Sequence, residues 1–190
     1  MKKIRLNDSI FCSTLIDHVR IRDQILSDID KSLYTDDLHN EGQDYIDNVS
    51  KLDWSKSKNL ERTWVKKILP HLQIAVQDLV LQMGYGRSKI RDVWYQQYTQ
   101  GDCHDWHIHG EHFTGVYYLE FPKGSSRTQI CSPYDLKGKF INVSEGDFVL
   151  FPSHWIHRGG LLRGEKRKTI ISFNLLVGDP LNNKLINSVN

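Results

Sequence analysis

The second half of the chain is a series of short runs rich in aromatic and β-branched residues, and this pattern restricts the fold most. The runs are IRDVWYQQY, FTGVYYLEFP, RTQICS, FINVS, DFVLFP and TIISFNLLVG. Between them stand the glycine-bearing turns TQGD, PKGSS, DLKGK, EGD and LLRGE. Several short strands at this spacing are typical of a sandwich or barrel-like fold. We therefore predict a mainly β, jelly-roll core over residues 87–178.

The first half instead repeats apolar residues at intervals of three and four, which predicts amphipathic helices. One such pattern covers residues 9–33. A second covers residues 59–84, with a kink expected at Pro70 and a helix end at Gly84. We expect a single domain over residues 1–190, in which residues 1–86 form a helical support packed outside the core and residues 179–190 form a C-terminal tail.

The composition excludes several functional classes. The 25 basic and 23 acidic side chains give a net charge of +2, so no strong field favours nucleic acid. No apolar run approaches the length that spans a membrane, and polar residues interrupt the N-terminal segment where a signal peptide would need an apolar run. The cysteines lack any CxxC spacing, which favours a reducing cytoplasm: Cys12, Cys103 and Cys131.

Four of the nine histidines lie within the ten residues CHDWHIHGEH, which begin at Cys103. His107 and His109 are two residues apart, so on an extended segment both side chains project to one face. His157 ends the segment FPSHWIH, at the edge of another predicted strand. Two neighbouring ligands and one distant ligand are typical of non-haem iron sites with open coordination positions. The alternative is an exposed polar loop.

A further signal lies in GEKRKTIISFN. Alternation along a strand places Arg167, Thr169, Ile171 and Phe173 on one face, so a guanidinium and a hydroxyl point the same way. Arginine binds carboxylates through two parallel hydrogen bonds, which suits an anionic co-substrate beside a metal. A solvated basic turn is the alternative.

Residues from Val93 to Leu176 resemble the Fe(II)- and 2-oxoglutarate-dependent dioxygenases, especially the prolyl-hydroxylase-like branch and small oxygenases common in bacteriophages. QYTQGDCHDWHIH is similar to the family's Tyr-x-x-Gly segment that leads into a His-x-Asp motif. EGDFVLFPSHWIHRGG is similar to its Gly-Asp, strand and distal-histidine segment, and favours His157 over His154. The resemblance implies a double-stranded β-helix, hence a mainly β fold with N-terminal helices.

The resemblance also implies a site. Fe(II) would be held by His107, His109 and His157, with 2-oxoglutarate as co-substrate and O2 as oxidant. Arg167 lies about ten positions after the distal histidine, where the family binds the far carboxylate, and Thr169 would assist it. Lys166 and Lys168 are alternatives, because one residue of loop length would exchange them. The candidates to line the pocket are Tyr98 and His104.

The implied reaction is hydroxylation of a protein side chain or small metabolite, with release of succinate and CO2. His109 departs from the family, which has a carboxylate there; Glu111 would restore a carboxylate ligand in a shifted register. A neutral ligand in place of an anion changes the charge at the metal. Two alternatives stay open: a non-catalytic metal-binding jelly-roll module, such as a phage accessory or structural protein, and a cupin-like three-histidine dioxygenase without 2-oxoglutarate. For a phage protein, the expected location is the host cytoplasm.

Overall fold

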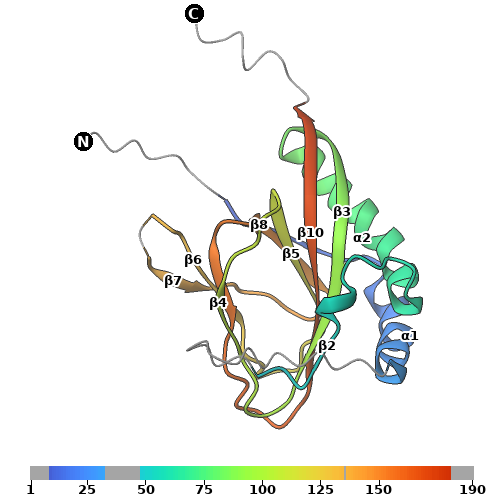
Figure 1. Ribbon diagram of the computed structural model, residues 1–190, viewed down its shortest axis with the longest axis vertical. Helices are drawn as coiled ribbons and strands as arrows, with labels where there is room; N and C mark the ends of the chain where they lie inside the picture. The colour runs from blue at the N-terminus through green and yellow to red at the C-terminus, as the bar shows by residue number, and fades with distance from the viewer. Residues whose placement is uncertain (1–8, 33–47, 135, 181–190) are drawn as a thin grey trace, which may run out of the picture.

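Two antiparallel sheets face each other in the computed structural model, and two helices cover the outer face of the larger sheet (Figure 1). The structure describes residues 9–32, 48–134 and 136–180; the remainder, including residues 181–190 of the predicted tail, lies outside the described residues. The large sheet follows the order β1 (Phe11–Thr14), β8 (Asp147–Pro152), β5 (Phe113–Glu120), β10 (Lys168–Pro180), β3 (Tyr85–Tyr98), β2 (Lys51–Leu52). The small sheet follows the order β4 (His104–His107), β9 (Ile156–Gly159), β6 (Thr128–Cys131), β7 (Gly138–Phe140).

The predicted fold class is confirmed, since the chain is mostly β with a jelly-roll arrangement of two sheets and few helices. The helices are α1 (His18–Lys31) and α2 (Thr63–Gln82), with a short 3-10 helix, η1 (Trp54–Lys56). Helix α2 runs through Pro70, whose ring is exposed. Within the described residues, neither helix is long and apolar enough to cross a membrane.

The helix predicted over residues 9–33 is wrong at its start. Residues Phe11–Thr14 form β1, which pairs with β8 at the edge of the large sheet, and the helix begins only at His18. The hydroxyl of Thr14 also donates a hydrogen bond to Asp147 at 2.7 Å. Helical spacing of the apolar residues did not outweigh the backbone hydrogen bonds that the open edge of β8 offers.

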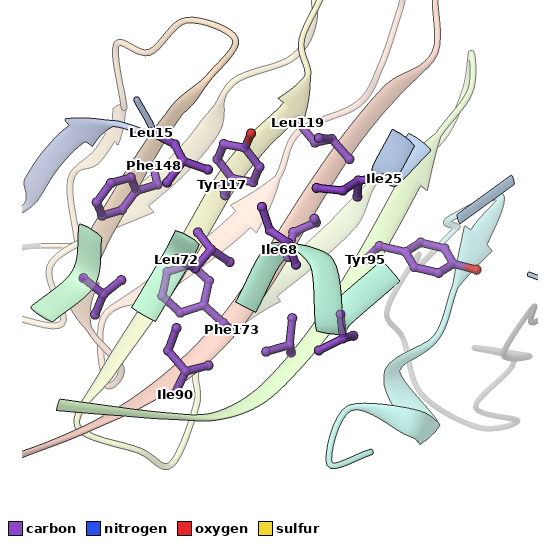
Figure 2. Packing of buried hydrophobic residues seen from close by; sticks show 14 of the residues in the cluster. Leu15, Ile25, Ile68, Leu72, Ile90, Tyr95, Tyr117, Leu119, Phe148 and Phe173 are labelled. Atoms are coloured by element: carbon purple, nitrogen blue, oxygen red, sulfur yellow. The ribbon is translucent and has the colours of Figure 1, made fainter. Parts of the chain in front are cut away.

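Alternation along the strands of the large sheet divides the buried residues into two clusters. The outer cluster lies between the sheet and the helices, and Figure 2 shows Ile25, Ile68 and Leu72 of the helices directed at the face that carries Tyr117 and Phe173. The inner cluster lies between the two sheets. Its members alternate in sequence with outer ones along β3, β5, β8 and β10, so these four strands are buried on both faces. The members of the inner cluster include Trp94, Tyr98, Val116, Tyr118, Val149, Phe151 and Ile170.

Gly115 of β5 marks a place where a strand has no room for a side chain. A Cβ built on it would lie 2.1 Å from the ring of Phe173, which is fully buried. We predict that Gly115→Ala lowers the free energy of unfolding by about 1–3 kcal/mol, because overpacking displaces the Phe173 ring. Urea unfolding followed by circular dichroism measures the change.

Gly164→Ala is the control, because its Cβ would meet nothing within 4 Å and its backbone is not in the left-handed region. Equal stability of the two variants would contradict the packing argument.

Candidate metal centre

The small sheet brings the first two histidines together. Strands β4 and β9 are antiparallel with His107 opposite His157, and the centroids of the two rings are 4.2 Å apart. His109 follows β4 on a loop that is fixed by its backbone N–H, which donates to the carbonyl of Ser153 at 2.9 Å. Its ring centroid lies 5.1 Å from each of the other two. One nitrogen from each of the three rings lies within 4.8 Å of the others, so the set can hold a metal ion.

Backbone carbonyls set the tautomers of two of these rings. The carbonyl of Asp105 lies 2.7 Å from Nδ1 of His107, and that of Trp155 lies 3.0 Å from Nδ1 of His157. A carbonyl can only accept, so each Nδ1 carries the proton and each Nε2 keeps its lone pair. This hydrogen bond to the second ring nitrogen is common among metal-binding histidines.

Burial favours the neutral form of His109 and His157. It lowers the pKa of His109 to about 3, with a smaller contribution from the charge of His107. Burial and the neighbouring imidazoles also hold the pKa of His157 well below its usual range. Imidazole binds metals through an unprotonated nitrogen, so the two lone pairs are available at neutral pH without loss of a proton.

Tyr98 and His104, the two predicted pocket residues, lie on one hydrogen-bonded chain that ends at the histidine cluster. The hydroxyl of Tyr98 donates to Oε1 of Gln96, and the amide nitrogen of Gln96 lies 3.2 Å from Nδ1 of His104. The His104 ring stacks on His107 with centroids 4.0 Å apart. Gln96 was missed at the sequence level, where an interior glutamine carries no distinguishing signal.

Other candidate ligands lie away from the cluster. His154 is exposed beside the ring of Tyr134, at 6.5 Å between centroids. The carboxylate of Glu111 lies 3.8 Å from a guanidinium nitrogen of Arg91. Among the described residues, the group that can hold a metal contains His109 and does not contain Glu111.

Arg167 and Thr169 share a face, as expected, but that face is turned away from the histidines. Ile171 and Phe173 on the same face belong to the outer cluster beneath the helices. Arg167 forms ion pairs of 2.8 Å with Glu120 and 2.7 Å with Asp30, and Thr169 donates to Glu120 at 2.8 Å. Both side chains therefore already have partners outside the barrel.

Lys168 points to the opposite face, into the space between the sheets. It is fully buried, and its ammonium lies 4.5 Å above the ring of Tyr98 and donates to the backbone carbonyl of Ser126 at 2.9 Å. Burial lowers the pKa of Lys168 to about 7. Among the described residues no carboxylate forms an ion pair with it, while the buried hydroxyl of Ser126 has no hydrogen-bond partner.

Aromatic side chains cover His109. The ring of Trp94, which is buried in the inner cluster, lies 5.5 Å from that of His109. Trp54 of η1 meets Trp94 edge-on at 4.5 Å and is 44% exposed, so it forms part of the rim. Neither tryptophan was predicted at the site, because each belongs to a segment whose position relative to the histidines depends on tertiary packing.

The donor set fits a divalent transition metal. Three imidazole nitrogens suit iron, zinc, copper or nickel, and ligands from one side leave further coordination positions open. The buried ammonium of Lys168 fits an anionic ligand, since a buried charge is normally paired. The residues present therefore accommodate both a metal ion and an organic anion.

No known family profile matches the sequence, and no curated protein is similar to it. The fold is similar to solved structures. A prolyl hydroxylase from Trichoplax adhaerens, in complex with a hypoxia inducible factor peptide, is 15% identical with a TM-score of 0.63 over 90% of this chain and 84% of that one. The viral collagen prolyl hydroxylase of Paramecium Bursaria Chlorella virus-1, in its 2OG complex, is 15% identical with a TM-score of 0.59 over 89% and 95%.

A third similar structure is an oxidoreductase of the 2OG-Fe(II) oxygenase family from Burkholderia pseudomallei, 11% identical with a TM-score of 0.51 over 63% of this chain. The match spans about 60% of the length of that protein. At these identities the similarity shows a shared fold. The jelly roll is the architecture on which these oxygenases are built.

We predict that His157→Ala lowers the affinity for a divalent metal by roughly 100-fold or more, because it removes a buried nitrogen ligand. Isothermal titration with Co(II), with visible spectra of the bound ion, measures the loss. His154→Ala is the matched control and should bind as the unaltered chain does. Equal affinity of the two variants would contradict the ligand set. The same titration of His109→Ala and Glu111→Ala shows whether His109 or Glu111 is the third ligand, because only loss of the ligand should weaken binding.

Proposed function

We propose that the chain is a non-haem Fe(II)- and 2-oxoglutarate-dependent oxygenase, which hydroxylates a protein side chain or small metabolite and releases succinate and CO2. The observation that carries the proposal is a fully buried lysine without an anionic partner among the described residues, which faces the same interior space between the sheets as three converging histidines. A metal ion beside a buried anion site is what such a reaction requires. The fold shared with known oxygenases supports it.

In this proposal Lys168 anchors the far carboxylate of 2-oxoglutarate. The ammonium and the unpartnered hydroxyl of Ser126 supply donors to an anion, and the pKa of Lys168 would rise on contact with a carboxylate. Arg167 and Thr169, the pair first expected for this role, are engaged with Glu120. The anchor thus moves by one residue, to an alternative already present in the sequence.

The remaining roles follow from position. His107, His109 and His157 would hold Fe(II), and with 2-oxoglutarate bound this centre supplies oxidative decarboxylation coupled to hydroxylation of a C–H bond. Tyr98 and His104 would line the side of the co-substrate, with Gln96 fixing both through its amide. Trp94 would exclude water from the side of His109.

The substrate and setting are also part of the proposal. A peptide bound to the Trichoplax protein makes a protein side chain one option for the substrate. The three cysteines, which lack any CxxC spacing, suit a reducing cytoplasm. An origin in a phage genome rests only on the resemblance of the sequence.

A second candidate function is a three-histidine dioxygenase that does not use 2-oxoglutarate. The presence of His109 where a carboxylate was expected favours it. The buried ammonium of Lys168 opposes it, as it opposes a non-catalytic metal-binding module, because neither requires an internal anion anchor.

The test is an anaerobic titration of the purified chain with Fe(II) and 2-oxoglutarate, followed by exposure to oxygen. We expect a visible charge-transfer band when both are present and succinate after oxygen is admitted. Iron binding without a band or succinate would overturn the proposal. Oxygen uptake without succinate would indicate the three-histidine alternative.

Substitution of Lys168 tests its proposed role as the anchor of 2-oxoglutarate. Lys168→Met keeps a long unbranched side chain but removes the charge, so we expect 2-oxoglutarate to bind at least tenfold more weakly, about the value of a charge-assisted hydrogen bond. Co(II) affinity should change less than twofold. Arg167→Met is the control and should leave 2-oxoglutarate binding unchanged. Weaker 2-oxoglutarate binding in Arg167→Met but not in Lys168→Met would instead identify Arg167 as the anchor.

A further inference from the structure

Asp92 and Asn174 form a second polar pair on the internal face of the large sheet. They are opposite each other on β3 and β10, and the amide nitrogen of Asn174 donates to Oδ2 of Asp92 at 3.3 Å. The two residues are 4% and 2% exposed. Oδ1 of each is buried and has no hydrogen-bond partner among the described residues. Two unused acceptors, one of them on a carboxylate, are an unusual arrangement for a protein interior.

Two separate series of contacts connect Asp92 and Asn174 to the histidine cluster. Asp92 is two positions from Trp94 on the same face of β3, and the ring of Trp94 lies 5.5 Å from His109. Asn174 is opposite Thr114, whose hydroxyl is hydrogen-bonded to that of Ser153 at 3.0 Å. The carbonyl of Ser153 in turn accepts the backbone N–H of His109 at 2.9 Å.

Along the internal face of β3, the neighbouring groups therefore change from a cation at one end to an anion at the other. Tyr98 lies beneath the ammonium of Lys168, Gln96 contacts His104, and Trp94 contacts His109. Asp92 comes next, about 7 Å along the strand from Trp94 and about 20 Å from Tyr98. The histidines thus stand between a cationic end and an anionic end of one strand face.

We propose that Asp92, supported by Asn174, determines substrate specificity by binding a cationic group of the substrate, a guanidinium or ammonium as in an arginine or lysine side chain. This rests on the proposed function, in which Lys168 takes the anionic co-substrate. A buried carboxylate needs a counter-charge, and the nearest basic side chain in sequence, Arg91, is exposed and faces Glu111. A cation held at Asp92 would direct the adjoining carbon atoms of the substrate along β3 toward Trp94 and His109.

The test is binding of two probes to the full chain, measured by isothermal titration without oxygen. The probes are N-acetyl-arginine methylamide and its neutral isostere N-acetyl-citrulline methylamide, with the lysine analogue as a third. Each is titrated into the chain alone and into the chain with Fe(II) and 2-oxoglutarate. We expect the arginine or lysine probe to bind at least tenfold more tightly than the citrulline probe. Equal or absent binding of the charged probes overturns the proposal.

Asp92→Asn keeps the shape and removes the charge, and should lower the affinity for the charged probe at least tenfold while sparing Co(II) affinity. Asp78→Asn, on the exposed face of α2, makes the same change in net charge far from the site and is the control. If Asp92→Asn fails to fold, the ratio of the affinities of the unaltered chain for the charged and citrulline probes still tests the proposal. Succinate formation without this preference would refute only the role of Asp92; the preference without succinate would refute only the oxygenase.

Discussion

The pairing of β3 with β10 is the constraint on which the rest of the structure depends. The two strands run antiparallel from Lys168 opposite Tyr98 to Pro180 opposite Tyr85, and they are the longest strands of the large sheet. Each carries apolar side chains on both faces, so the helices must cover one face and the small sheet the other. Because side chains alternate, this register also decides which polar residues are enclosed with the histidines and which pair outside.

The same alternation explains why polar side chains are retained inside an apolar barrel. Lys168 is buried, and its pKa of about 7 means that the fold loses stability at neutral pH, where the unfolded chain keeps the proton. Asp92 and Asn174 leave acceptors unused. Neither feature helps folding, and both border the three histidines. Groups that lower stability in this way and gather around one centre are typical of a site that binds ligands.

Five of the strands (β3, β5, β6, β8 and β10), both helices and the grouping of His107, His109 and His157 follow from local patterns that the sequence displays. The strand predicted for FINVS is wrong except at Phe140, which ends β7. Two further features do not follow from local patterns. Residues 11–14 have helical spacing yet form an edge strand, since the partner that satisfies their backbone lies far along the chain in β8. The segment KTIISFN mixes apolar and polar residues on both faces, so its pattern gives the alternation without telling which face turns toward the histidines. That choice depends on tertiary packing, and it decides between Arg167 and Lys168.

In the proposed function, the three histidine ligands also affect the role of Lys168 as the anchor of the co-substrate. With imidazole in place of a carboxylate, the histidines cancel none of the charge of a divalent ion, and that ion would disfavour a charged lysine nearby. A bound dicarboxylate would neutralise both charges, because one end would reach the ion and the other would raise the pKa of Lys168. Since the free lysine has a pKa of about 7, binding above this pH must take up a proton. In the proposed site, the absence of a carboxylate at position 109 would therefore couple the charge of Lys168 to binding of the co-substrate more closely than an anionic ligand would.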